Sequence, residues 1–307
     1  MTSTPWTASD LPDLDGRTFV VTGATSGLGL VTTRALARAG ARVVLAVRDT
    51  AKGEQVAAAT GGSTEVRRLD LADLASIGSF AEAWDEPLDV LVNNAGIMAV
   101  PERRTKDGFE LQIGTNHLGH FALTNLLLPH IADRVVTVSS RAHEMGKISL
   151  DDLNWERRRY SRWRAYGQSK LANLLFTLEL QRRLAEGGAP VRAYAAHPGY
   201  ASTNLQGHTS SVLQHGLMAV GNRLFAQSPE IGALPTLFAA TQDLPGASYV
   251  GPGGFQETRG YPALARRTAR AMDADTARRL WELSEQLTGT TFPVAATASR
   301  PETHSPA

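Results

Sequence analysis

Two side chains with acid–base potential, Tyr166 and Lys170, stand four residues apart in a stretch with helical periodicity. Residues at this spacing share one face of a helix. A phenol ordinarily has a pKa of about 10, too high for rapid proton transfer at neutral pH. A nearby ammonium stabilises the phenolate, so we expect the pKa of Tyr166 to fall by about three units. Taken alone, the spacing also fits an ordinary surface Tyr and Lys.

A glycine-rich segment follows an apolar run and precedes a helical stretch. Glycines remove side chains where backbone must approach a pyrophosphate, and a helix N-terminus offers free N–H donors. In this context the segment predicts a dinucleotide phosphate site, although a tight strand-to-helix turn without a ligand has the same pattern. The residues that we assign to the cofactor here are Gly23, Thr25, Ser26, Gly27, Leu28 and Gly29.

The elements that must position these residues alternate along the chain. We predict strands at 17–22, 41–47, 66–69, 88–92, 134–138 and 191–196. Helices are predicted at 30–39, from 49, and at 73–84, 109–128 and 164–186. Continuous apolar strands separated by helices predict an α/β fold: a single-domain, Rossmann-like, doubly wound parallel sheet with helices on both faces. Ligands of such sheets bind beyond the carboxyl ends of the strands, where these motifs stand.

The chain shows no linker that would divide it into two domains. We expect an N-terminal extension at 1–15, one dinucleotide-binding domain at 16–290 and a disordered tail at 291–307. Within the domain, residues 200–232 predict an insertion of loops and short helices. Apolar side chains there fit either a hydrophobic substrate lining or packing against the domain: Tyr200, Leu205, Val212, Leu213, Leu217, Met218, Leu224 and Phe225.

Over roughly residues 16–290, the chain resembles the classical short-chain dehydrogenase/reductase family. The glycine spacing matches that family's Thr-Gly-x-x-x-Gly-x-Gly, and further motifs follow in family order: Asn93-Asn94-Ala95-Gly96, Asn116, Ser140, Tyr166-Gly-Gln-Ser-Lys170 and Pro198-Gly199. The segments 116–121 and 138–143, and the long separation of Ser140 from Tyr166, resemble the retinol-dehydrogenase-like branch.

The resemblance implies a role for each of four catalytic residues. Tyr166 would be the acid in carbonyl reduction and the base in alcohol oxidation. Lys170 would lower the pKa of Tyr166 and bind the nicotinamide ribose. Ser140, the second of two adjacent serines, would orient and polarise the substrate oxygen. Asn116 would hold a water that links Lys170 to solvent.

The resemblance also assigns cofactor contacts outside the glycine turn. Asp70 and Leu71 would lie at the adenine, and Asn94 beside the adenine ribose. Pro198, Gly199 and Thr203 would hold the nicotinamide carboxamide. Asp70 and Asn94 also fit the role of ordinary turn residues.

The choice of nicotinamide cofactor depends on the end of the second predicted strand. An acid there would read the ribose 2′-hydroxyl, whereas an Arg suits a 2′-phosphate. The strand ends at Val47 and Arg48 follows, and a guanidinium pairs with a phosphate in bidentate fashion. We therefore predict NADP(H). In the alternative, Arg48 is a solvated loop residue and Asp49, which also fits a helix cap, reads the ribose.

Composition narrows the function classes. The 307 residues carry 31 Lys and Arg against 30 Asp and Glu, so a net charge of +1 gives no general case for nucleic acid or an anionic membrane. Without cysteine, disulfides, thiolate metal sites and cysteine nucleophiles are excluded. No apolar run approaches the roughly 20 residues of a membrane span, and residues 1–15 do not resemble a signal peptide, so we expect a cytoplasmic protein.

Two further patterns carry weaker predictions. His117 and His120 have a spacing compatible with a metal, but no third ligand is evident, so we expect packing or surface roles and no metal site. A basic run interleaved with aromatics precedes Tyr166. It predicts a solvated loop beside the active site that could steer an anionic substrate, rather than a nucleic-acid surface. The run comprises Arg157, Arg158, Arg159, Tyr160, Arg162, Trp163 and Arg164.

Together these patterns predict an NADP(H)-dependent oxidoreductase that reduces an aldehyde or ketone, or oxidises the corresponding alcohol. Its partner would be a hydrophobic small molecule, not nucleic acid or membrane. The alternatives are an NADP-binding regulator without catalysis and a reductase of a conjugated double bond. The resemblance further implies a homodimer or homotetramer built through the helices at 109–128 and 164–186.

Overall fold

The computed structural model describes residues 5–199 and 228–293. The strands are β1 (Thr18–Thr22), β2 (Arg42–Val47), β3 (Thr64–Arg68), β4 (Leu88–Asn93), β5 (Ile131–Val138), β6 (Arg192–Ala196), β7 (Tyr249–Pro252) and β8 (Pro262–Leu264). The α-helices are α1 (Gly27–Arg38), α2 (Thr50–Thr60), α3 (Leu74–Glu82), α4 (Leu111–Ile113), α5 (Gly119–Leu127), α6 (Arg162–Glu186), α8 (Pro229–Thr241) and α9 (Ala274–Thr288).

These strands form one sheet in the order β3-β2-β1-β4-β5-β6-β7-β8. All neighbouring pairs are parallel except β7 and β8, which pair antiparallel at the edge. The predicted doubly wound parallel sheet is thus confirmed for β1 to β7. The chain order reverses between β1 and β4, so a crevice opens beyond their carboxyl ends.

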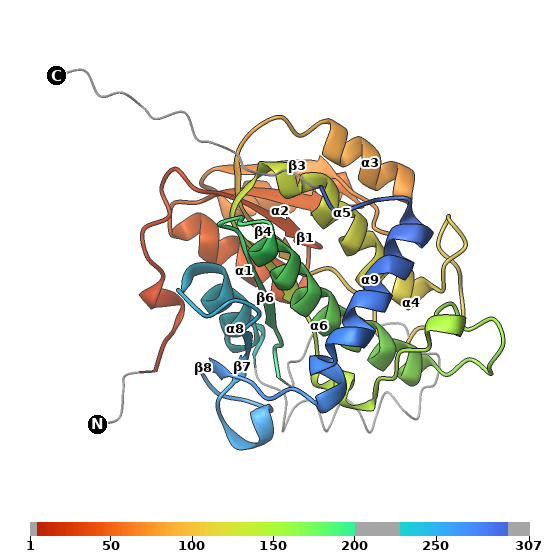
Figure 1. The fold of residues 1–307 in the computed structure, drawn as a ribbon. Helices are drawn as coiled ribbons and strands as arrows, with labels where there is room; N and C mark the ends of the chain where they lie inside the picture. The colour runs from red at the N-terminus through yellow and green to blue at the C-terminus, as the bar shows by residue number, and fades with distance from the viewer. Residues whose placement is uncertain (1–4, 200–227, 294–307) are drawn as a thin grey trace, which may run out of the picture.

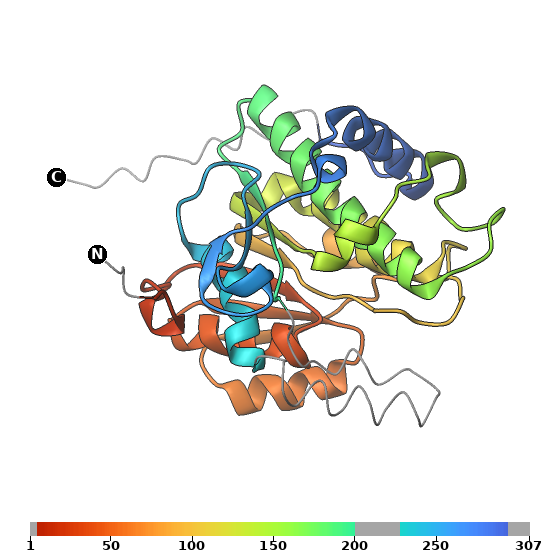
Figure 2. The same cartoon turned by 90° about the horizontal axis from the view of Figure 1, so that it is seen from below.

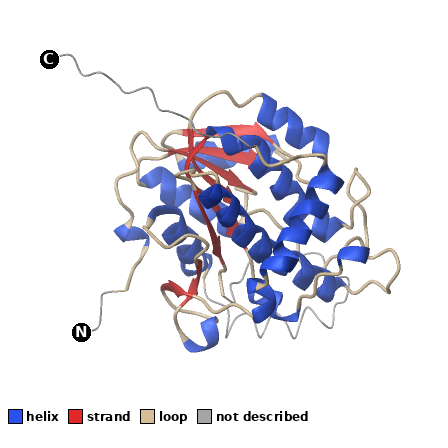
Figure 3. Ribbon diagram, in the orientation of Figure 1, coloured by secondary structure: helices blue, strands red, loops and turns tan. Residues whose placement is uncertain are grey.

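Helices cover both faces of the sheet (Figure 1, Figure 3). On one face α1, α2 and α8 share an apolar cluster in which Leu36 and Leu237 lie with Val43 of β2 and Val136 of β5. On the other face α3, α5 and α6 pack through Phe80, Phe121 and Phe176. Because each strand alternates its side chains between these layers, the central strands are largely buried, whereas the edge strands β3 and β8 are partly exposed.

The helix predicted at 109–128 is interrupted. A π-helical turn, Gly114–Leu118, separates α4 from α5 and contains Asn116. A π turn holds one more residue than an α turn, so it rotates the side chains that follow, and such turns are frequent at functional sites. The interruption therefore aims Asn116 at the neighbouring strand end instead of continuing the face of α5.

The outer surfaces of α5 and α6 are covered by α9 of the same chain (Figure 1, Figure 2). The Trp281 ring lies 4.8 Å from that of Phe121 and 5.6 Å from that of Phe176, and Ser284 Oγ lies 3.0 Å from His117 Nε2. In α5 only Leu126 is exposed. Because α9 covers much of this face within the chain, a subunit interface here would have to include α9, and the predicted homodimer or homotetramer stays a prediction.

The predicted N-terminal extension packs closely on the domain. Leu14 is fully buried, and the Trp6 ring meets Phe238 of α8 edge-on at 5.1 Å. The predicted insertion at 200–232 ends earlier than expected, since α8 begins at Pro229 with Ser228 as its N-cap. Residues 200–227, with the proposed apolar lining, and the tail from 294 lie outside the described residues.

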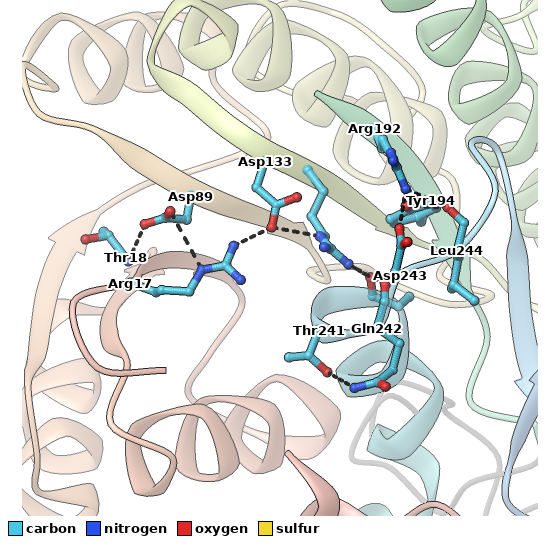
Figure 4. Close-up of polar contacts among 12 residues, drawn as sticks. Arg17, Thr18, Asp89, Asp133, Arg192, Tyr194, Thr241, Gln242, Asp243 and Leu244 are labelled. Carbon is cyan, nitrogen blue, oxygen red and sulfur yellow. Dashed lines mark hydrogen bonds and ion pairs between the residues drawn. The ribbon is translucent and has the colours of Figure 1, made fainter. Parts of the chain in front are cut away.

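Ion pairs hold the amino ends of the strands together (Figure 4). Arg17, just before β1, pairs with Asp89 of β4 and Asp133 of β5. Asp133 also pairs with Arg134 at 3.0 Å, and Arg134 donates to the carbonyl of Gln242 at 2.6 Å. These charges lie at the edge of the sheet opposite the crevice, so their role is to fix the strands.

Candidate active site at the carboxyl edge of the sheet

The glycine turn between β1 and α1 is shaped for a close approach of backbone. Gly23 and Gly27 have φ of +66° and +53°, which L side chains rarely adopt. A Cβ on Gly29 would lie 2.5 Å from both the Gly23 carbonyl oxygen and Asn94 Nδ2. Ser26, the N-cap of α1, makes no side-chain capping hydrogen bond, so the first N–H groups of the helix remain available to an anion.

The other residues predicted in this turn fall into two kinds. Thr25 and Ser26 are partly exposed at the tip, whereas Leu28 is buried below it. Asn94 braces the turn from β4, because its Nδ2 donates to the Thr22 carbonyl at 2.8 Å. The adenine-ribose role assigned to Asn94 stays a prediction, since this hydrogen bond explains its place without a ligand.

At the ends of β2 and β3, Arg48 is exposed and makes no hydrogen bond or ion pair with any described residue. Asp49 caps α2 through Oδ1, which accepts from Lys52 N at 3.0 Å. The cap favours Arg48 over Asp49 as the residue that reads the ribose. Asp70 Oδ1 accepts from Ala72 N, and Leu71 is buried with its carbonyl against Gly119.

The two serines after β5 have distinct partners. Ser139 is buried and its Oγ donates to the Lys170 carbonyl at 2.8 Å, so it ties β5 to α6. Ser140 Oγ accepts from Ala142 N at 3.1 Å, and Ser140 is the side chain that opposes the rise in the pKa of Tyr166. The structure thus brings the second serine, and not the first, to the tyrosine, in agreement with the sequence assignment.

Tyr166 and Lys170 lie on one face of α6, as the spacing predicts. Their exposed fractions are 7% and 4%. Lys170 Nζ donates to the carbonyl of Val138 at 3.0 Å and lies 5.8 Å from the centre of the Tyr166 ring. The last residue of β5 therefore anchors the ammonium beside the phenol.

The neighbouring ammonium does not by itself lower the pKa of Tyr166, and the contribution expected from a positively charged nicotinamide ring stays a prediction. Burial raises the pKa of Tyr166 to about 12, and Ser140 opposes the rise without cancelling it. Burial lowers the pKa of Lys170 to about 8. Desolvation of two enclosed groups outweighs their mutual attraction. At neutral pH the phenol consequently keeps its proton and can donate it.

Asn116 fixes the segment that follows β4. Its Oδ1 accepts from Ile97 N at 2.8 Å, while Nδ2 donates to Ile97 O and Ser169 Oγ, both at 2.9 Å. A Cβ on Gly96 would lie 3.3 Å from Asn116 Oδ1 and 3.4 Å from Lys170 Nζ. Gly96 therefore lies next to both polar groups, and the water-holding role of Asn116 stays a prediction.

The two histidines of this helix are internal. His120 lies between Thr22 Oγ1 and the Asn116 carbonyl, at 3.0 and 3.1 Å, and His117 contacts Ser284. Burial lowers the pKa of His117 to about 3 and that of His120 to about 4, so both rings are neutral. The packing role predicted for them is confirmed. Within residues 5–199 and 228–293, no group of three or more acidic or histidine side chains could hold a metal ion.

Pro198 and Gly199 follow β6 at the same edge of the sheet. Gly199 has φ of +68°, and a Cβ there would lie 2.5 Å from the Thr258 carbonyl oxygen. The turn thus fits closely under the loop between β7 and β8. Thr203, the third residue predicted here, lies outside the described residues.

The basic run lies beside the active site, as predicted. The Trp163 ring meets that of Tyr166 edge-on at 6.4 Å. Arg158 is engaged by Asp152 at 3.1 Å and by the face of Trp155. Arg159, Arg162 and Arg164 line a shallow cavity of about 570 Å³ with Pro101, Tyr160, Ser161 and Trp163.

Sequence reasoning missed several residues that shape the site. His143 Nδ1 is hydrogen-bonded to the Ser140 carbonyl at 2.8 Å. Glu110, buried, accepts from Tyr160 Oη at 3.0 Å and from two backbone N–H groups, which ties the start of α4 to the segment before α6. The position of His143 in Val138-Ser-Ser-Arg-Ala-His143 was a usable signal; nothing local marks Glu110.

Comparison with known proteins agrees with this geometry. A family model described as short chain dehydrogenase matches residues 17–213. Human retinol dehydrogenase 13 is 42% identical over 296 residues, covering 91% of this chain and 87% of its own. A crystal structure of an uncharacterised protein from Mycobacterium paratuberculosis is 58% identical with a TM-score of 0.84, covering 94% of this chain and 100% of its own.

A more distant structure carries a nicotinamide cofactor. It comes from Beutenbergia cavernae, is described as an NAD(P)-dependent gluconate 5-dehydrogenase, and holds NADP at low occupancy. It is 30% identical with a TM-score of 0.56, and the match covers 75% of this chain and 91% of that one. In the described part of the present chain, none of the helices has the length and apolar character needed to cross a membrane.

Proposed function

The chain belongs to the short-chain dehydrogenase family, in the branch of the retinol dehydrogenases, and from that premise we propose that it is an NADP(H)-dependent reductase of hydrophobic aldehydes or ketones. Members of this family are oxidoreductases that bind nicotinamide dinucleotides. The observation that carries the proposal is the enclosed trio at the carboxyl edge, in which Lys170 Nζ lies 5.8 Å from the centre of the Tyr166 ring and Ser140 acts on the pKa of the phenol.

The residues present fit a dinucleotide. The glycine turn packs so closely that only glycine fits at position 29, and the N-terminus of α1 lacks a side-chain cap. These features would hold the pyrophosphate, with Pro198 and Gly199 at the nicotinamide end. A reduced nicotinamide supplies a hydride to the carbonyl carbon.

The side chains complete the reaction by moving one proton. The Ser140 hydroxyl orients the carbonyl oxygen, and Tyr166 Oη transfers its proton to that oxygen as negative charge develops there. The phenolate left behind faces the Lys170 ammonium, which stabilises it. Because burial raises the pKa of Tyr166 to about 12, the phenol is protonated at neutral pH, and this supports reduction as the favoured direction.

Arg48 supports the preference for NADP(H). It stands just after β2, is exposed, and makes no hydrogen bond or ion pair with any residue in 5–199 or 228–293. A guanidinium without a protein partner at this position can give all of its hydrogen bonds to a 2′-phosphate. Asp49 is engaged as a helix cap, so it is the weaker candidate for a ribose contact.

The names of the curated relatives point to the substrate class. Human retinol dehydrogenase 13 is named for a long, apolar alcohol, so we include retinal among the candidate substrates. We propose the cytoplasm as the location, where an NADPH pool would drive reduction.

The test is a screen of NADPH and NADH consumption with the purified full chain. The panel contains retinal, medium-chain aldehydes, aromatic aldehydes, aromatic ketones and a cyclic enone. We expect consumption of NADPH with an aldehyde or ketone and formation of the matching alcohol. Saturation of the enone double bond without alcohol formation would instead support a double-bond reductase. NADPH binding without turnover on any member would support a regulator.

A further inference from the structure

The turn Pro198–Gly199 is fixed by the residue before it. His197 is fully buried, and its main-chain N–H continues the β6–β7 pairing by donating to the Val250 carbonyl at 2.8 Å. The main-chain N–H of Gly199 donates to Nδ1 of the same His197 ring at 3.2 Å. The His197 side chain is therefore hydrogen-bonded to the main chain of the turn that follows it. Its Nδ1 must carry no proton, because it accepts this hydrogen bond.

The opposite nitrogen of this ring faces a carboxylate. His197 Nε2 lies 3.3 Å from Glu257 Oε2, although the N–H is not aligned well enough to count as a full hydrogen bond. Burial lowers the pKa of His197 to about 3, so the ring is neutral and carries its single proton on Nε2. A Cβ on Gly251 would lie 1.9 Å from Nε2, so β7 gives this nitrogen room only because Gly251 has no side chain.

Glu257 reaches His197 at a conformational cost. Gln256 and Glu257 have φ of +48° and +55°, values that are uncommon for residues other than glycine. Glu257 Oε1 accepts from Arg266 N at 2.8 Å, and Arg141 Nη1 donates to the Gln256 carbonyl at 2.7 Å. The loop between β7 and β8 is thus tied both to the segment after Ser140 and to the histidine below the turn.

From this arrangement we infer that His197 and Glu257 are positioning residues for the nicotinamide end of the cofactor: Glu257 holds the His197 ring in the tautomer and orientation that place the Pro198–Gly199 turn. The inference rests on the proposed function, because the turn acts on a nicotinamide only if a dinucleotide binds here. Neither residue touches the reacting atoms. The effect of Glu257 must pass through the His197 ring.

The experiment compares two ligands in the purified full chain. NADPH spans the whole crevice, whereas 2′,5′-ADP carries only the adenosine end and should not sense the turn. Dissociation constants for both are measured by titration for wild type, Glu257→Ala, His197→Asn and the double variant. Asparagine keeps an acceptor near the position of Nδ1 but is too short to reach Glu257. Glu144→Ala is the matched control, because this carboxylate pairs with Arg141 at 3.1 Å and has no hydrogen bond or ion pair with His197 among the described residues.

We expect Glu257→Ala to weaken NADPH binding about 3- to 10-fold, because the His197 ring loses the carboxylate that faces Nε2, with 2′,5′-ADP unaffected. In the His197→Asn background, Glu257→Ala should add nothing, because the two residues act as one unit. Glu144→Ala should bind both ligands like wild type.

Three results would overturn the inference: unchanged NADPH affinity in Glu257→Ala, an equal loss for both ligands, or an equal effect of Glu257→Ala with and without His197. Failure of the wild type to bind either ligand would refute the proposed function itself.

Discussion

The amino ends of the central strands carry Arg17, Asp89, Asp133 and Arg192, whereas Thr22 and Asn93 end β1 and β4, and Ser139 and His197 follow β5 and β6. At the amino edge Arg17 pairs across strands with Asp89 and Asp133, and Arg192 pairs with Asp243 after α8. At the carboxyl edge Ser139 Oγ and the Lys170 ammonium each bond to a backbone carbonyl. One edge pairs its charges with one another and holds the sheet. The other places the Lys170 ammonium among uncharged side chains.

This difference predicts that removal of a serine hydroxyl lowers turnover at the carboxyl edge but not at the amino edge. Removing the hydroxyl of Ser140 takes away the proposed polarising group next to the Tyr166 phenol, so Ser140→Ala should lower kcat about 10²- to 10³-fold with little change in the midpoint of thermal unfolding. The control is Ser248→Ala, just before β7, where the hydroxyl only donates to the Pro245 carbonyl. Equal kcat losses in the two variants would contradict the division between the edges.

At the exposed end of the crevice, a substitution should change the selectivity for NADPH over NADH without changing the stability of the fold. In Arg48→Asp a carboxylate replaces a guanidinium that has no described partner, so NADPH should be repelled and the ratio of kcat/KM for NADPH over NADH should fall about 10- to 100-fold. The free energy of unfolding in urea should not change. A variant with wild-type selectivity for NADPH would show that Arg48 does not read the 2′-phosphate.

At the buried end of the crevice, the protonation of Lys170 should make kcat/KM depend on pH. Burial lowers the pKa of Lys170 to about 8, so its ammonium loses a proton as the pH rises through that value, while the phenol of Tyr166 keeps its proton up to about pH 12. The kcat/KM for reduction should therefore be level below pH 8 and fall up to about tenfold per pH unit above it. A profile that stays level to pH 10 would show that the charge on Lys170 is not required.

At the amino edge, Asp133→Asn should affect stability alone. Asp133 bridges Arg17 and Arg134; Asp133 and Arg17 are partly exposed, and the buried Arg134 keeps its hydrogen bonds to the carbonyls of Ala239 and Gln242. Loss of the bridge should lower the free energy of unfolding by about 1 kcal/mol, as for other partly exposed networks. We expect kcat and KM to match wild type. A lower kcat without a lower free energy of unfolding would show that Asp133 contributes to catalysis, and this would contradict the prediction.

The sequence was most informative where the chemistry is local. The glycine spacing, the Tyr166–Lys170 pair and the strand ends each lie within a few residues, so they could be read directly. Glu257 meets His197 across 60 positions of chain, and α9 covers α5 by a contact between distant segments; neither has a local signal. The burial that raises the pKa of Tyr166 was not predicted, because spacing shows a neighbouring charge but not how far the two groups are desolvated.

The most direct test of Tyr166 as the catalytic acid compares two variants, each of which removes one tyrosine hydroxyl. Tyr166→Phe removes the proposed proton donor, and Tyr194→Phe removes a hydroxyl that donates to the Leu244 carbonyl at the amino edge (Figure 4). NADPH affinity and turnover are measured for both with a carbonyl substrate found in the screen. We predict that both bind NADPH like wild type and that only Tyr166→Phe loses turnover, by about 10²- to 10⁴-fold. Turnover in Tyr166→Phe equal to that of Tyr194→Phe would contradict the assignment of the catalytic acid.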